Sequence, residues 1–93
     1  MTREEEFLGE WRQIRPDPAP ARIVVSFEAN GSLVYTMHGE GELRIELTWQ
    51  LDGDTIAIAD EAAKEPRLSR FHFRSHSMLV LEREGETYVY VRC

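Results

Sequence analysis

The sequence predicts an all-β domain, an eight-stranded antiparallel up-and-down meander that follows a short N-terminal helix and closes into a small barrel. Three observations lead to this prediction. Apolar residues recur at every second position from residue 10 onward, which is the period of strands with one buried face. Short turn sequences separate these stretches, so consecutive strands should pair as hairpins. The 93 residues suffice for one domain, residues 1–93, and closure removes the edges of an open sheet.

The N-terminal segment predicts one or two helical turns over residues 3–8. Thr2 and Glu5 have the spacing of a capping box, and the acidic residues after Thr2 suit the positive end of a helix dipole. Gly9 ends the helix almost at once. We expect Phe7 and Leu8 to pack against the rest of the domain.

Strict alternation of apolar and polar residues defines the strands. The clearest example is residues 43–51 (LRIELTWQL), in which every odd position is apolar and every even position is polar. This pattern is typical of an antiparallel strand with one face in the core and the other in water. The expected strands are residues 10–15, 22–28, 33–38, 42–51, 55–59, 68–74, 78–83 and 87–92.

Turn residues connect these strands. Asn30-Gly31 is the strongest hairpin signal in the chain. Two connections are longer. Residues 16–20 (PDPAP) predict an extended linker or lid, because proline cannot donate to a strand ladder. Residues 60–66 have room for one helical turn. The other expected turns are at residues 39–41, 52–54, 75–77 and 84–86.

Several short motifs resemble those of one family. Gly9-Glu10-Trp11 is similar to the Gly-x-Trp that opens the first strand of lipocalins after a short helix, and Arg92 lies in the last strand, where those barrels carry an arginine that packs on this tryptophan. Residues 27–31 (FEANG) and 49–56 (WQLDGDTI) resemble small bacterial lipocalin-like (calycin) domains. The resemblance implies a barrel that holds a small apolar ligand. It implies no single activity, because a fold does not fix a function.

The interior of the expected barrel has two alternatives. Large side chains occupy its inward rows: Phe27, Tyr35, Trp49, Phe71 and Phe73. An eight-stranded barrel is just wide enough to be filled by side chains or to hold one small ligand. Because the strands are short, the sequence leaves both a filled core and a ligand-sized pocket open.

The strand over residues 87–92 carries the most informative polar residues. If Tyr88 and Tyr90 face inward, two hydroxyls and the guanidinium of Arg92 share the interior, where arginine and tyrosine together suit a carboxylate. Alternatively, the valines face inward, or Arg92 simply covers Trp11 through a cation–π contact. The residues expected to line a ligand site are Tyr35, Trp49, Tyr88, Tyr90 and Arg92.

A basic stripe follows from the alternation of the strand over residues 68–74. Arg70, His72 and Arg74 share the face opposite the phenylalanines. This stripe is either a small anion-binding surface or a solvated strand face that pairs with Glu46 or Glu82 across the sheet. The second interpretation is the simpler one.

Metal-binding and catalytic residues are not expected. His38 and Glu42 flank a glycine turn, while His72 and His76 are four apart, which is ligand spacing for a helix and not for a strand. The chain shows no nucleophile elbow, no phosphate loop and no pair of inward carboxylates. We therefore expect no enzyme activity, no metal and no cofactor.

Charge and composition restrict the partners. The chain has 11 Lys and Arg against 17 Asp and Glu, a net charge of -6, which opposes binding to nucleic acid. It has no apolar stretch of membrane-spanning length. An acidic N-terminus without a signal peptide and the single Cys93 favour a cytoplasmic protein.

The leading hypothesis is therefore a non-catalytic protein that binds a small apolar or carboxylate-bearing molecule inside the barrel. The alternative is a structural or interaction protein with a filled core, which acts as a homodimer or through a protein partner. The identity of any ligand, partner or process is beyond the sequence.

Overall fold

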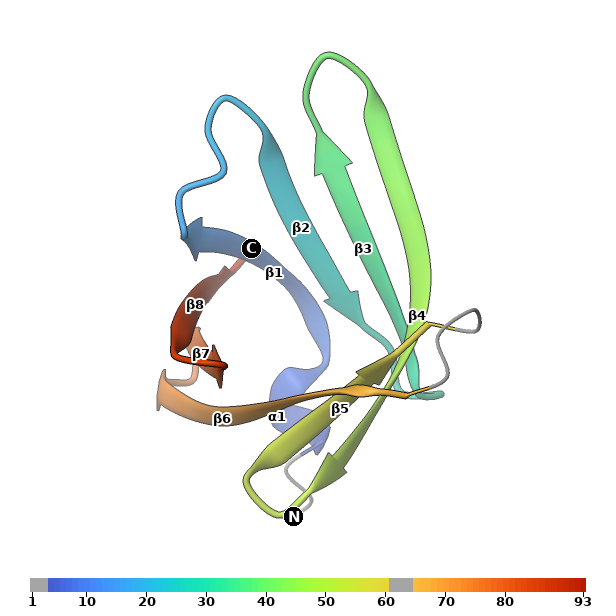
Figure 1. Cartoon of the computed structure of the whole chain (residues 1–93), viewed down its shortest axis with the longest axis vertical. Helices are drawn as coiled ribbons and strands as arrows, with labels where there is room; N and C mark the ends of the chain where they lie inside the picture. Colours follow the sequence, from blue (N-terminus) through green and yellow to red (C-terminus); the bar gives the residue numbers. More distant parts are fainter. Residues whose placement is uncertain (1–3, 61–64) are drawn as a thin grey trace.

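A closed antiparallel barrel is the architecture of the computed structural model, which describes residues 4–60 and 65–93. Within these residues the strands follow one another in chain order around the barrel, and β8 pairs with β1 to close it (Figure 1). The predicted all-β meander with a short N-terminal helix is confirmed. Its elements are α1 (Glu4–Phe7), β1 (Gly9–Arg15), β2 (Arg22–Phe27), β3 (Ser32–His38), β4 (Glu42–Asp52), β5 (Thr55–Ala59), β6 (Arg67–Ser75), β7 (Met78–Arg83) and β8 (Glu86–Arg92).

The strand boundaries agree with the sequence to within one residue at each end. The register explains this agreement. Trp11 pairs with Val25, Val25 with Tyr35, and Tyr35 with Ile45, so the apolar rows of successive strands face the same side. A slip by one residue would turn every row outward, so the alternating pattern selects this register.

One connection within the described residues differs from expectation. Residues 16–20 form a turned loop and not an extended linker, because Ala21 N donates to Pro18 O at 2.9 Å and Asp17 Oδ1 accepts from Ala19 N at 3.0 Å. The capping residue Thr2 and most of the helical turn expected within residues 60–66 lie outside the described residues.

Aromatic side chains fill the half of the barrel next to α1, here called the closed half. Phe7 is fully buried. Its ring centroid lies 4.9–5.5 Å from the rings of four other residues, a spacing typical of attractive aromatic pairs. We call the whole group the aromatic cluster: Phe7, Trp11, Phe27, Trp49, Phe71 and Phe73.

Arg92 ties α1 to the last strand. Its guanidinium donates to Leu8 O and Glu6 O at 2.8 Å each and to His76 O at 3.2 Å. It also lies 4.2 Å from the ring of Trp11, whose Nε1 donates to the carbonyl at the end of α1 at 2.7 Å. The cation–π alternative for this arginine is thus confirmed, and α1 is held by the carbonyls that a helix C-terminus leaves unpaired.

The glycine of the Gly-x-Trp motif has a steric reason. Gly9 has a φ of 112°, which L side chains rarely adopt. A Cβ at this position would lie 3.2 Å from Nη1 of Arg92. The chain therefore needs glycine where it turns from α1 into β1 beneath the guanidinium.

Gly9→Ala should lower the free energy of unfolding by about 1–2 kcal/mol, because alanine is strained at positive φ and crowds the guanidinium. Gly41→Ala is the matched control, since among the described residues beyond its chain neighbours no atom lies within 4 Å of a Cβ there, and its φ is not positive. Urea unfolding of both variants measures the difference. Equal midpoints for the two variants would argue against this explanation.

Candidate functional site

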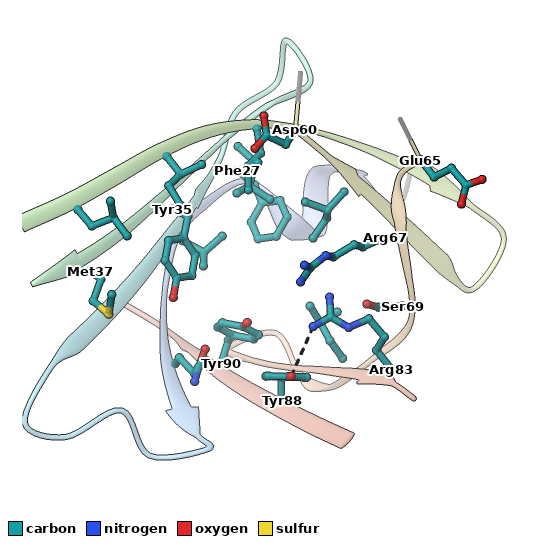
Figure 2. Close-up of a pocket in the computed structure, with 18 residues that line it drawn as sticks. Phe27, Tyr35, Met37, Asp60, Glu65, Arg67, Ser69, Arg83, Tyr88 and Tyr90 are labelled. Carbon is teal, nitrogen blue, oxygen red and sulfur yellow. Dashed lines mark hydrogen bonds between the residues drawn. The ribbon is translucent and has the colours of Figure 1, made fainter. Parts of the chain in front are cut away.

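The half of the barrel away from α1 is open. It contains a cavity of about 560 Å³ lined by side chains from β1 to β8 and from the β5–β6 connection (Figure 2). Each of the two alternatives for the interior therefore holds for one half of the barrel. The aromatic cluster fills the closed half. The open half contains a cavity whose volume lies within the range of small-molecule sites, roughly 300–1,000 Å³.

One wall of the cavity is apolar. It is built by the inward rows of β3 and β4, including Met37, Leu43, Ile45 and Leu47. Leu43 keeps 46% of its surface exposed because it lies near the tip of the β3–β4 hairpin, which reaches past the ends of β5 to β8 (Figure 1). Covering an exposed apolar side chain at a cavity mouth with another apolar group removes apolar surface from water, which is favourable in free energy.

The facing wall is polar and carries two cations. Arg67 belongs to β6 and Arg83 to β7, and Figure 2 shows both guanidinium groups reaching into the cavity toward one another. Arg83 Nη2 donates to the Tyr88 hydroxyl at 3.4 Å, and that hydroxyl donates to Glu86 Oε2 at 2.6 Å. Ser69, buried on β6, lines the same wall.

Neither cavity arginine has an ion pair within 4.0 Å among residues 4–60 and 65–93. Asp60 and Glu65 also line the mouth, but Glu65 points away from the cavity in Figure 2. The described lining therefore holds two arginines in the cavity and the acids Asp60 and Glu65 at its mouth.

The tyrosines of β8 face inward, which decides the orientation of this strand. Burial raises the pKa of Tyr90, with smaller contributions from Tyr35 and Tyr88 in the same direction and an opposing one from Arg83. Burial also raises the pKa of Tyr35. Both hydroxyls therefore stay protonated at neutral pH and act as neutral hydrogen-bonding groups inside the cavity.

The structure separates the five residues expected to line a ligand site. Tyr35, Tyr88 and Tyr90 lie together in the cavity. Trp49 and Arg92 do not line it. Trp49 belongs to the aromatic cluster and donates from Nε1 to a backbone carbonyl of the β2–β3 turn at 3.1 Å, while Arg92 is held at α1. Both residues lie near the strand ends that α1 covers. Their side chains therefore belong to the closed half and not to the open half.

Sequence reasoning missed the two cavity arginines. The signal was available, because Arg67 has the same parity as the inward Phe71 and Phe73, and Arg83 follows the buried Leu79 and Leu81 at the same spacing. The inward parity of each arginine near a strand end was therefore the signal in the sequence for these two residues.

Two residues of the outward basic stripe lie beside exposed acids. His72 Nδ1 lies 3.7 Å from Glu82 Oε1, and Arg70 lies 3.4 Å from Asp54. The predicted pairing of the stripe with Glu82 is confirmed, whereas Glu46 pairs with Arg44 on its own strand at 3.3 Å. Exposed pairs of this kind contribute little to stability, about 0–1 kcal/mol each.

The three histidines are exposed. His38 lies 4.0 Å from Glu42 at an exposed turn. In the part of the chain that the structure describes, no group of three or more His, Cys, Asp or Glu side chains comes together.

No family model, curated protein or solved structure matches this chain. Its relation to known folds therefore rests on the closed eight-stranded antiparallel barrel, which agrees with a lipocalin-like barrel in general shape. Across residues 4–60 and 65–93, no helix has the length and apolar character needed to cross a membrane.

Proposed function

We propose that this protein is a non-catalytic binding module that holds a small, largely apolar molecule in the open half of the barrel. The observation that carries the proposal is the cavity of about 560 Å³, whose apolar β3–β4 wall faces a wall with a few polar groups. Small-molecule sites combine a mostly apolar surface with a small number of orienting polar side chains. The protonated tyrosines suit binding, because they donate hydrogen bonds and are poor proton acceptors.

The proposal includes the lipocalin-like family. It is supported by Gly9 and Trp11 at the start of β1, by Arg92 stacked on Trp11, and by a short helix that covers one end of a meander barrel. A binding role fits this arrangement, since the closed half supplies the rigid base and the open half supplies the space. The homodimer or protein partner of the alternative hypothesis stays a prediction.

Ile45→Trp tests the cavity directly, because the larger side chain of an inward β4 residue occupies the space a ligand needs. A neutral probe that fluoresces in apolar surroundings, N-phenyl-1-naphthylamine, should bind the unmodified protein and lose at least about tenfold in affinity in this variant, or about 1.4 kcal/mol. Arg44→Trp places the same indole on the outward face of β4 and should change the affinity by less than about twofold.

Circular dichroism melting establishes that both variants fold. The absence of probe binding to the unmodified protein would contradict the proposed function. Equal losses in the two variants would show that the probe binds outside the barrel.

A further inference from the structure

We propose that the two cavity arginines form an oxyanion site, so that the barrel selects amphiphiles with an anionic head over neutral or cationic ones. Arg67 and Arg83 would hold the head against the β6–β8 wall, and the apolar tail would lie along the β3–β4 wall. This inference rests on the proposed function and deepens it, because it names the chemical class of the ligand and its orientation.

The placement of the two arginines favours an anion between them. Arg67 pairs with Ile58 across β5 and β6, and both side chains line the cavity. Arg67 is exposed at the start of β6, and Arg83 is half-buried at the end of β7. Two guanidinium groups that reach toward one another repel, and no carboxylate within ion-pair distance offsets this charge among the described residues. An anion between them would remove the repulsion.

The hydrogen-bond donors of the two arginines also favour an anionic ligand. A guanidinium has five N–H donors, and Arg83 uses one of them on Tyr88 in the hydrogen bonds that the structure shows. The nearby acid, Glu86, already accepts from the Tyr88 hydroxyl at 2.6 Å. Remaining donors of both arginines can therefore serve a carboxylate, sulfonate or phosphate, whose paired oxygens match the planar fork of a guanidinium.

The two positive charges that line the cavity contrast with the negative net charge of the chain. The chain has a net charge of -6, and two arginines of the outer face, Arg44 and Arg70, form exposed ion pairs with acids. Arg67 and Arg83 differ in facing inward. A diffuse negative surface repels anions, so selective uptake of an anionic ligand requires cations placed at the binding space itself.

The opposite wall fixes the direction of the ligand. Figure 2 shows Tyr35 and Met37 across the cavity from Arg67 and Arg83. The remaining apolar lining there comes from β4. Since burial of an alkyl chain is favourable only against apolar surface, the tail should follow β3 and β4 with the head at the arginines.

The test compares four ligands with the same twelve-carbon chain, used below their micellar concentrations to displace N-phenyl-1-naphthylamine. They are laurate, dodecyl phosphate, 1-dodecanol and dodecyltrimethylammonium. The unmodified protein should bind at least one of the two anions about tenfold or more tightly than dodecanol, and the cation most weakly. Laurate and dodecyl phosphate separate a carboxylate from a phosphate preference.

The double variant Arg67→Gln/Arg83→Gln should bring the anions to within about twofold of dodecanol, while dodecanol binding stays unchanged and reports an intact pocket. Arg74→Gln is the matched control, because Arg74 is exposed on β6 with outward parity and its replacement should keep the preference for anions. Equal binding of anions and dodecanol by the unmodified protein would overturn the oxyanion site and leave the pocket standing. An equal loss in Arg74→Gln would also overturn it, since surface charge would then explain the preference. If no ligand displaces the probe, or the probe itself fails to bind, both proposals fall.

Discussion

Phe7→Ala should lower the free energy of unfolding by about 3–5 kcal/mol. Phe7 is fully buried and its ring contacts Phe27, Trp49, Phe71 and Phe73. Removing it leaves a hole in the centre of the aromatic cluster and detaches α1 from the closed half. Because a small domain has only about 5–15 kcal/mol of total stability, this variant should be partly unfolded at 37 °C.

Urea unfolding followed by tryptophan fluorescence measures this effect, since Trp11 and Trp49 both belong to the cluster. Leu68→Ala is the control, because Leu68 is 59% exposed and should lose no more than about 0.5 kcal/mol. If Phe7→Ala were as stable as Leu68→Ala, α1 would not be part of the core.

Arg92→Met should lower the free energy of unfolding by about 2–3 kcal/mol. The variant loses three hydrogen bonds to backbone carbonyls and the cation–π contact with Trp11. The loss is smaller than the sum of separate interactions because part of the guanidinium is exposed and water replaces some of the bonds. It should be accompanied by faster amide hydrogen exchange at the start of β1, which Arg92 holds against α1.

Arg74→Met removes an exposed arginine of β6 and serves as the control, with an expected change below about 0.5 kcal/mol. Arg92→Lys should recover less than half of the lost stability, because an ammonium cannot reach several carbonyls in the fork geometry of a guanidinium. Full recovery by lysine would mean that charge alone, and not the hydrogen-bonding geometry, holds α1.

The fold could be predicted from local sequence because its strands face water on one side only. Residues 43–51 alternate without exception, and the Asn30-Gly31 turn brings β3 back beside β2. Short links then fix the order of the strands, and β8 meets β1. Among the connections that the structure describes, the one over residues 16–20 differed, since local backbone and Asx hydrogen bonds turn it.

The candidate site was harder to predict because it depends on contacts between distant parts of the chain. Val89 and Tyr90 are both compatible with a core, so alternation within β8 does not choose between them. The register with β7 does, since Leu79 pairs with Tyr90 and Leu81 with Tyr88. The extent of the cavity depends on Phe7. Its side chain projects from α1 into the closed half and helps to fill it, whereas the open half stays unfilled.

The most direct test of a ligand site in the open half is an NMR titration of the protein with laurate, followed at arginine Nε–Hε and at methyl groups. We expect saturable shifts at Arg67, Arg83 and the methyl groups of Ile45, with little change at Arg74 on the outer face of β6. Shifts that are absent, or that are largest at Arg74 or in the aromatic cluster around Phe7, would contradict it.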